Sequence, residues 1–203
     1  MKNILCFGDS NTFGYIPENG RRYDKNTRWT GVLQRLCKDD YEITEAGCNN
    51  RTCFMDNPCG INFTGYKILP SLLNKRFDII ILSIGINDIQ KLYNPPMEEV
   101  KRGIEKLILI SKEKLPKAKI IIVSPPRLTN DVLNGSFSFQ FDKTSIEKSL
   151  LFAEIYKKTA KKNGCLFFDL DKIITVSPVD GLHYSEETHN IIAHSLYDFI
   201  LNN

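Results

Sequence analysis

The sequence predicts an α/β fold built on a doubly wound parallel sheet with helices on both faces. Apolar runs of strand length alternate along the chain with segments of helical periodicity, which is the pattern of repeated βα units joined by right-handed crossovers. Residues 78–84 and 119–123 are β-branched and apolar on both faces, as in parallel strands that helices cover on both sides. A length of 203 residues with 42% hydrophobic content suits a single domain over residues 1–203.

Strands and helices are expected in alternation. The predicted strands are residues 3–7, 42–46, 78–84, 119–123 and 166–170, and each ends at a turn signal. The predicted helices are residues 29–38, 64–73, 97–114, 143–163 and 186–201. Apolar side chains at helical spacing, such as Val100, Ile104 and Leu107, support them, and Gly164 ends the fourth helix as a C-cap. Residues 48–63 and 129–142 are expected to be long loops, which often carry function.

The net charge, the N-terminal residues and the cysteines limit which classes of protein the sequence fits. The net charge of +3, from 27 basic and 24 acidic residues, is too balanced to predict nucleic-acid binding. The N-terminus has too short an apolar stretch for a signal peptide, and no run is long enough to span a membrane. We therefore expect a cytoplasmic protein without membrane insertion. The six cysteines are expected to be reduced thiols, and the spacing of Cys48, Cys53 and Cys59 matches no zinc pattern.

Polar and glycine-containing segments follow the predicted strands, at the ends where open α/β sheets bind their ligands. They are residues 8–11, 47–50, 85–88, 125–127 and 179–183. Because the carboxyl ends of parallel strands meet at one edge of a sheet, we expect these five segments to lie close together.

Four of these segments contain the residue types of an acyl-transfer site. Ser10 is a candidate nucleophile, which needs a base, and His183 lies in a loop at the same edge. Asp180, three positions before His183, suits a carboxylate that fixes the imidazole tautomer. The N–H groups of Ser10 and Gly47 and the amide of Asn87 are candidate donors to an oxyanion. Each residue alone would also suit a helix cap, a turn or a surface histidine.

Four blocks in order resemble the SGNH, or GDSL-type, serine hydrolases. They are GDSNTFG (residues 8–14), EAGCNNRT (45–52), GIND (85–88) and DGLH (180–183). The resemblance runs from residue 3 to about residue 200, and RWTG (28–31) is most similar to an arylesterase and acetyl-esterase branch. Two positions depart from the usual pattern, because Asn11 stands where leucine is common and Asn50 where that branch carries glycine.

The resemblance implies a flavodoxin-like, three-layer α/β/α fold with five parallel strands, no metal and no cofactor. It implies Ser10 as nucleophile, His183 as base and Asp180 as its partner, with Ser10, Gly47 and Asn87 as oxyanion donors. It also gives His189 a structural role. The nucleophile lies near the N-terminus and outside the G-x-S-x-G elbow of the α/β-hydrolases.

Substrate-side residues are expected next to the nucleophile. The candidates are Asn11, Cys48, Asn49 and Pro125, followed by Trp29 and Tyr15. The aromatic segment FSFQF (residues 137–141) would suit a pocket wall, a lid or a subunit contact.

The predicted activity is that of a serine esterase cleaving small, acetyl or short-chain, carboxylic esters through an acyl-enzyme. Alternatives on the same triad are a lysophospholipase, a thioesterase or an O-acetyl-carbohydrate esterase. A non-catalytic ligand-binding module is a further alternative. The expected partner is a small-molecule ester, and the resemblance also suggests a homo-oligomer.

Overall fold

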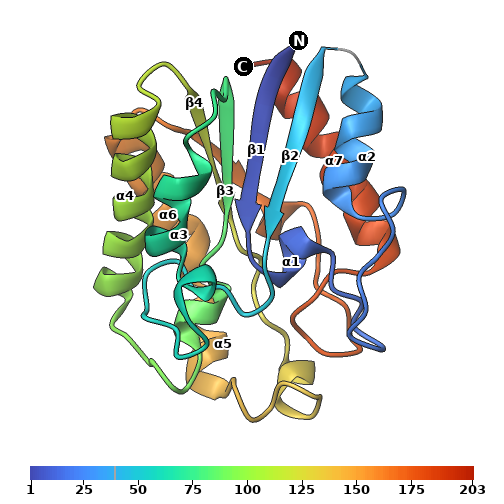
Figure 1. Cartoon of the computed structure of the whole chain (residues 1–203). Coiled ribbons are helices and arrows are strands. Elements are labelled where there is room, and N and C mark those ends of the chain that lie inside the picture. The colour runs from blue at the N-terminus through green and yellow to red at the C-terminus, as the bar shows by residue number, and fades with distance from the viewer. Residues whose placement is uncertain (39) are drawn as a thin grey trace.

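In a computed structural model, which describes residues 1–38 and 40–203, five parallel strands form one sheet in the order β2-β1-β3-β4-β5 (Figure 1). The strands are β1 (Lys2–Gly8), β2 (Tyr41–Gly47), β3 (Ile79–Ser83), β4 (Lys119–Ser124) and β5 (Leu166–Asp169). This is the order of a flavodoxin-like sheet. The predicted fold class is confirmed, and each predicted strand is found to within one residue at either end.

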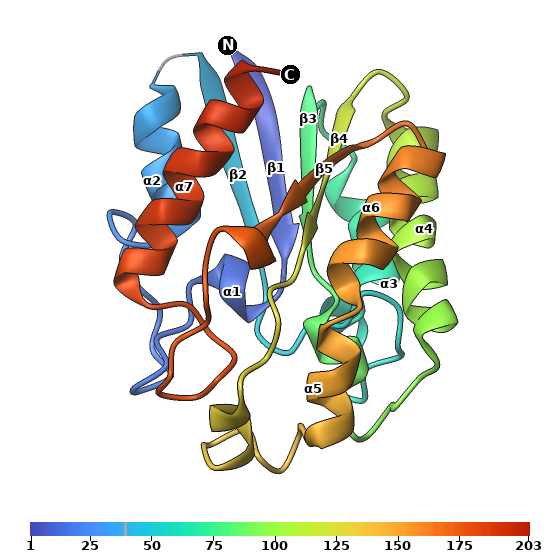
Figure 2. The ribbon, with the colours of Figure 1, turned by 180° about the vertical axis from the view of Figure 1, so that it is seen from behind.

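Helices cover both faces of the sheet, so that the molecule has three layers (Figures 1 and 2). One face carries α2 (Trp29–Cys37) and α7 (Glu186–Leu201), which pack against each other. The other face carries α3 (Gly65–Leu72), α4 (Met97–Lys114) and α6 (Phe152–Lys162). The remaining helices are α1 (Ser10–Phe13) and α5 (Lys143–Ser149), with short 3-10 helices at Ile61–Phe63, Ile86–Ile89, Asn130–Leu133 and Leu170–Lys172.

Two apolar layers, one on each face of the sheet, make up the core. Leu5 and Phe7 of β1 point to the layer that contains α3, α4 and α6, whereas Ile4 and Cys6 point to the layer that contains α2 and α7. All four side chains are fully buried. This alternation, with apolar residues on both faces, is what a central parallel strand requires.

The predicted helix over residues 143–163 is divided into α5 and α6. The hydroxyl of Ser149 donates to the carbonyl of Ile146 and accepts the N–H of Leu128. Beyond it, the N–H of Leu151 bonds the carbonyl of Lys148, three residues back. A serine that bonds local backbone groups competes with the regular helical pattern, which accounts for the break that apolar periodicity alone did not predict.

The sheet order decides which loops reach one another. The two neighbours of β1 are β2 and β3, and Gly8 at the end of β1 pairs with Gly47 and Ser83. The loops after β1, β2 and β3 are therefore adjacent, whereas the loop after β4 is one strand further away. Both chain termini lie at the opposite end of the sheet (Figure 1). In the described part of the chain, none of the helices has the length and apolar character that crossing a membrane would require.

Candidate active site

Ser10 begins the short helix α1 directly after β1. The carboxylate of Asp9 caps this helix by accepting the N–H of Asn11 at 3.0 Å. Gly14 ends it at a φ of 87°, in the left-handed region, and its N–H returns to the carbonyl of Ser10. The caps hold Ser10 at the first helical position with 5% of its surface exposed.

Ser10, His183 and Asp180 form a continuous hydrogen-bonded relay. The Nε2 atom of His183 lies 2.9 Å from the Ser10 Oγ, and its Nδ1 atom lies 2.6 Å from Oδ2 of Asp180. Because an ionised carboxylate only accepts, Nδ1 carries the proton and Nε2 offers its lone pair to the serine hydroxyl. The relay has the geometry of a nucleophile, a base and an orienting acid.

A tight turn holds the acid and the base at fixed positions. Oδ1 of Asp180 accepts the N–H groups of Leu182 at 3.0 Å and His183 at 2.9 Å. The N–H of Ser177 bonds the carbonyl of His183 at 2.7 Å and closes the loop. Burial alone would raise the pKa of Asp180, but hydrogen bonds from His183 and the turn amides lower it below its ordinary value. Asp180 is thus an ionised partner for the imidazole at neutral pH.

Asn11 links the nucleophile helix to the loop of the acid and the base. Its Nδ2 donates to the carbonyl of Leu182 at 3.3 Å, and its side chain is 5% exposed. The residue does not line the cavity beside Ser10, and the contact of its side chain is this cross-link. An amide at this position can form a cross-link that leucine, the commoner residue there, cannot.

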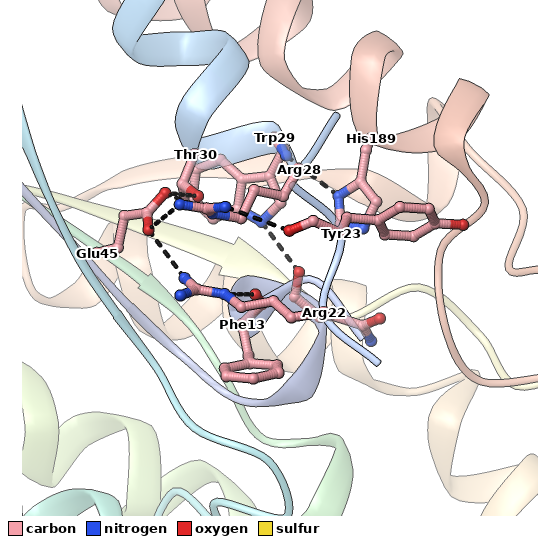
Figure 3. Close-up of polar contacts among 9 residues, drawn as sticks. Phe13, Arg22, Tyr23, Arg28, Trp29, Thr30, Glu45 and His189 are labelled. Carbon is pink, nitrogen blue, oxygen red and sulfur yellow. Dashed lines mark hydrogen bonds and ion pairs between the residues drawn. The ribbon is translucent and has the colours of Figure 1, made fainter. Parts of the chain in front are cut away.

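The far end of α1 is held by side chains from the segment that leads into α2 (Figure 3). The indole Nε1 of Trp29 donates to the Asn11 carbonyl at 3.2 Å, and Nε of Arg22 donates to the Phe13 carbonyl at 2.7 Å. Since a helix leaves its last carbonyls without intrahelical donors, these two bonds fix the end of α1. Trp29, a weaker candidate for substrate contact, is 1% exposed, and its indole holds the end of α1.

Glu45 of β2 anchors this support. Its carboxylate accepts from Arg22 at 2.8 Å, from Arg28 at 2.8 Å and from the hydroxyl of Thr30 at 2.6 Å (Figure 3). Burial would raise the pKa of Glu45, but its hydrogen bonds with Arg28 and Thr30 and the nearby guanidinium charges lower it. We name Glu45, Arg22, Arg28 and Thr30 the Glu45 clamp.

A cavity of about 80 Å³ opens beside the nucleophile. Its lining combines the nucleophile and base with apolar rings and side-chain amides: Ser10, Tyr15, Asn49, Asn50, Asn87, Phe137, Gln140, Leu182 and His183. A cavity of this size holds only a few non-hydrogen atoms, since drug-sized pockets are roughly 300–1,000 Å³. The lining places the expected residues Asn49 and Asn87 beside Ser10 and His183.

Asn87 and Asn50 present polar groups to this cavity. Nδ2 of Asn87 donates to the Arg51 carbonyl at 3.1 Å, and its Oδ1 accepts from Gln90 at 2.9 Å. The second Nδ2 hydrogen remains for a ligand. Asn50 adopts a φ of 58°, the left-handed conformation that glycine and asparagine tolerate best. Asparagine can therefore replace the usual glycine here without changing the path of the loop.

Gly47, a predicted oxyanion donor, packs against α1. It is absent from the cavity lining, and a Cβ added to it would lie 2.2 Å from the backbone nitrogen of Phe13. The N–H of Cys48 donates to the Gly8 carbonyl at 3.2 Å. Because successive amides of a strand point to opposite sides, the N–H of Gly47 points away from β1 and Ser10. Glycine is required here for the close approach of α1 to β2.

Asp88 shapes the loop after β2, a role that its position beside Asn87 did not reveal. Its carboxylate accepts the successive N–H groups of Cys53, Phe54 and Met55 at 2.6, 2.9 and 3.1 Å. Burial raises the pKa of this carboxyl to about 6, and the three amides oppose the rise. The loop that carries Asn49 and Asn50 is thereby tied to the segment after β3.

Two other expected substrate contacts lie away from the cavity lining. Cys48 is half-buried, and its Sγ bonds the carbonyl of Asn49 at 3.6 Å. Pro125 is buried after β4. Pro125 is absent from the cavity lining.

Sequence reasoning missed several residues that complete the cavity. Asn50 stood out only as a departure from the family pattern, and Gln140 and Leu182 were not singled out within the segments 137–141 and 179–183. The segment 137–141 divides its aromatic side chains, with Phe137 on the cavity, Phe139 70% exposed and Phe141 in the core. Its pocket interpretation therefore holds for Phe137.

Neither the open groove beside Glu45 nor a group of metal-ligating side chains supplies a second candidate site among the described residues. An open groove of about 600 Å³ lies over β2 and α2 beside Glu45, but the Glu45 carboxylate is already bonded by the clamp. Within residues 1–38 and 40–203, no three His, Cys, Asp or Glu side chains are grouped so that they could hold a metal ion. The six cysteines are free thiols.

Comparisons with known proteins find one matching family model and several similar solved structures. The model of the GDSL-like lipase/acylhydrolase family matches residues 6–191. The inhibitor-bound aryl esterase of M. smegmatis is 29% identical, with a TM-score of 0.92 over 100% of this chain and 99% of that chain. A carbohydrate acetylesterase from Sinorhizobium meliloti is also 29% identical, with a TM-score of 0.90 over 100% and 99% of the two chains. A putative arylesterase from Agrobacterium tumefaciens is 28% identical, with a TM-score of 0.88 over the same shares. No curated protein sequence matches the chain.

Proposed function

Because the chain belongs to the GDSL-like lipase/acylhydrolase family, we propose that it is a serine esterase that cleaves small carboxylic esters through an acyl-enzyme on Ser10. The observation that carries this proposal is the relay from Asp180 through His183 to Ser10, with contacts of 2.6 and 2.9 Å. A structural cap or a surface histidine would not require this alignment. The complete relay also argues against a binding module that has lost turnover.

The reaction proceeds in two acyl transfers. The Ser10 Oγ attacks the ester carbonyl while Nε2 of His183 takes its proton, and Asp180 stabilises the imidazolium that forms. The imidazolium then protonates the leaving alcohol as the carbon–oxygen bond breaks. Water attacks the acyl-enzyme with His183 again as base, which releases the acid and restores the Ser10 hydroxyl.

The oxyanion is stabilised by donors that converge beside Ser10. We assign this role to the N–H of Ser10, the free Nδ2 hydrogen of Asn87 and the N–H of Asn50. The cavity lining supports Asn50 in place of Gly47 as the backbone donor after β2. The N–H groups of Ser10 and Asn50 donate to no acceptor in the part of the chain that the structure describes. Each such donor typically contributes about 2.7–4 kcal/mol to the transition state.

The cavity supports an acetyl or short acyl group. Its volume of about 80 Å³ compares with roughly 30 Å³ for one water molecule in the liquid. Phe137 and Leu182 offer apolar contact to an acyl methyl group, whereas a long chain would need a deeper cleft. The small volume therefore argues against a lysophospholipase.

An O-acetylated carbohydrate is the second candidate substrate. The side-chain amides of Asn49, Asn50 and Gln140 on the cavity wall could bond sugar hydroxyls. The similarity to a carbohydrate acetylesterase supports this candidate, and the similarity to aryl esterases supports an aryl acetate.

The first test is hydrolysis of p-nitrophenyl acetate by the wild type, Ser10→Ala and the control Ser71→Ala. Ser71 is an exposed serine of α3 and serves as the matched substitution. We expect turnover by the wild type and Ser71→Ala, none by Ser10→Ala, and preserved circular dichroism in all three. A fluorophosphonate should label only the proteins that retain Ser10.

Turnover by Ser10→Ala at the wild-type rate would reject the mechanism. If all three proteins are inert and none is labelled, the chain is a binding module. A series of p-nitrophenyl esters from acetate to octanoate then tests the acyl size, with a steep fall expected beyond butyrate. Acetylated sugars tested beside phenyl acetate distinguish the two alcohol classes.

A further inference from the structure

Two aromatic rings that no step of the acyl transfer uses pack against the imidazole of His183 and against each other. The ring of Tyr15 stacks on it with a centroid separation of 4.2 Å and an interplanar angle of 27°. Phe137 approaches at 4.9 Å with a tilt of 60°, and the two aromatic rings meet edge to face at 5.8 Å. His183 is 2% exposed. The ring of Tyr15 therefore covers a face of the buried base, with the tilted ring of Phe137 beside it.

The backbone of the nucleophile places the stacked ring. Gly14 turns the chain after α1, and the N–H of Tyr15 donates to the Ser10 carbonyl at 3.0 Å. The hydroxyl of Tyr15 points toward Gly20, where an added Cβ would lie 3.1 Å from the phenolic oxygen. Stacking requires the ring and not the hydroxyl.

The charged and titratable groups around His183 decide how far the Tyr15 ring can affect the charge of the imidazole. Asp180 pairs with Nδ1, Ser10 faces Nε2, and His189 approaches from α7. Burial, followed by the charge of His183, lowers the pKa of His189 to about 3, so His189 is neutral at working pH. Asp180 is then the charged neighbour that balances the imidazolium, and a π face is the other contact that favours a cation.

We propose that Tyr15 is a positioning residue, whose ring keeps the His183 imidazole in line with Ser10 and stabilises the imidazolium formed during acyl transfer. The proposal rests on the proposed function, since it takes His183 as the base. A cation over an aromatic face within about 6 Å gains roughly 0.5–2 kcal/mol, more when it is desolvated. The stacking distance of 4.2 Å lies inside this range.

The experiment must distinguish the loss of the Tyr15 ring from the entry of water beside the His183 imidazole. Replacement of Tyr15 by alanine would hydrate the imidazole, which raises its pKa by itself. Tyr15→Leu keeps an apolar side chain over His183 but removes the π face. Tyr15→Phe keeps the π face and removes only the hydroxyl. The leucine and phenylalanine variants therefore form a matched pair in which the π face is the main difference.

The experiment measures the rate of Ser10 labelling by a fluorophosphonate, and kcat/KM for p-nitrophenyl acetate, against pH. Both report the fraction of neutral His183 in the free enzyme. We expect Tyr15→Phe to keep the wild-type pKa of the profile and Tyr15→Leu to lower it by about 0.5–1 unit. Phe137→Leu should lower it less, because its ring is tilted to the imidazole at 60°.

A profile of Tyr15→Leu at the same pKa as Tyr15→Phe, or at a higher one, overturns the proposal. Circular dichroism establishes folding, and Tyr15→Met replaces the leucine variant if that one does not fold. Ser10→Ala is run in parallel. Labelling or turnover of Ser10→Ala rejects the proposed function itself, whereas an inert Ser10→Ala with an unshifted leucine profile rejects only the role of Tyr15.

Discussion

Two buried histidines near the C-terminus show what separates a base from a structural residue. His183 is 2% exposed and His189 is fully buried. Nδ1 of His183 donates to the Asp180 carboxylate, whereas Nδ1 of His189 accepts the backbone N–H of Trp29 at 3.2 Å (Figure 3). The two rings therefore hold opposite tautomers, and only His183 presents an unprotonated Nε2 to a hydroxyl.

Surroundings, and not burial as such, give the two rings their different chemistry. Nε2 of His189 has no hydrogen-bond partner among the described residues, and the centroid of the imidazole lies 5.2 and 5.5 Å from the ring centroids of Tyr23 and Tyr184. Burial is the first cause that lowers the pKa of His189 to about 3. His183 has instead a carboxylate at 2.6 Å, which accepts from its Nδ1.

The same substitution at both positions should separate these roles most sharply. His183→Asn removes the proton acceptor, so turnover of p-nitrophenyl acetate should fall by at least about 10⁴-fold. In His189→Asn, the amide oxygen can still accept the Trp29 N–H, so we expect turnover within about 10-fold of the wild type. Initial rates at saturating ester measure both.

His189→Leu completes this comparison, because leucine fills the space but leaves the Trp29 N–H without an acceptor. It should reduce the free energy of unfolding by about 1–3 kcal/mol relative to His189→Asn. Turnover by His183→Asn at the rate of His189→Asn would contradict the assignment of the base.

Asp180→Asn tests the carboxylate that distinguishes His183. The amide oxygen can still accept the turn N–H groups of Leu182 and His183, but the NH₂ group would face Nδ1 and favour the wrong imidazole tautomer. Turnover should fall by about 10⁴-fold while the fold is kept, as for an orienting acid in general. Asp171→Asn, which alters an ion pair with Arg127 instead, is the matched control and should keep the wild-type rate.

The pH dependence of the free energy of unfolding should show that His189 is neutral in the folded protein. The folded pKa of about 3 lies below the ordinary 6.5, so the unfolded chain binds more protons between these values. The contribution of His189 is therefore full above pH 6.5 and is lost on acidification, by about 1.4 kcal/mol per pH unit. Urea unfolding from pH 7 to pH 5 should be less pH-dependent in His189→Asn. An equal pH dependence in both proteins would contradict burial of a neutral ring.

Local signals in the sequence predicted the strands and much of the relay. Apolar runs mark each strand, and the polar residues directly after β1 and β3 include Ser10 and Asn87. Asp180 and His183 lie within one turn, so their contact also follows from a short sequence separation. These elements could be predicted because each depends on neighbours along the chain.

Long-range packing determined what the sequence did not predict. The cavity beside Ser10 is lined by loops that are far apart in the sequence, and Pro125, directly after β4, is not in that lining. Phe137 reaches His183 because Phe141 is buried in the core and the N–H of Lys91 bonds the Gln140 carbonyl at 2.8 Å. The direction of the Gly47 amide depends on the register of β2 against β1.

A substitution in the Glu45 clamp should have the smallest effect on turnover. It extends the comparison from the two histidines to the side chains that hold Trp29 and α1. Glu45→Gln removes the charge shared by Arg22 and Arg28, whose side chains are 38% and 13% exposed. We expect the free energy of unfolding to fall by about 2 kcal/mol, because a partly buried guanidinium loses its partner. Loosening of the Arg22 bond to the Phe13 carbonyl should lower kcat by less than about 10-fold with little change in KM.

Glu42→Gln, an exposed glutamate on the same strand, is the control and should change neither quantity. In a double-mutant cycle, Arg22→Gln and Glu45→Gln should be non-additive by about 0.5–3 kcal/mol, since both disrupt one network. Additive effects would mean that Arg22 fixes α1 without help from Glu45. Trp29 and Arg22 bond different carbonyls of α1, those of Asn11 and Phe13. His189→Asn combined with Glu45→Gln should then separate the contribution of Trp29 to holding α1 from that of Arg22.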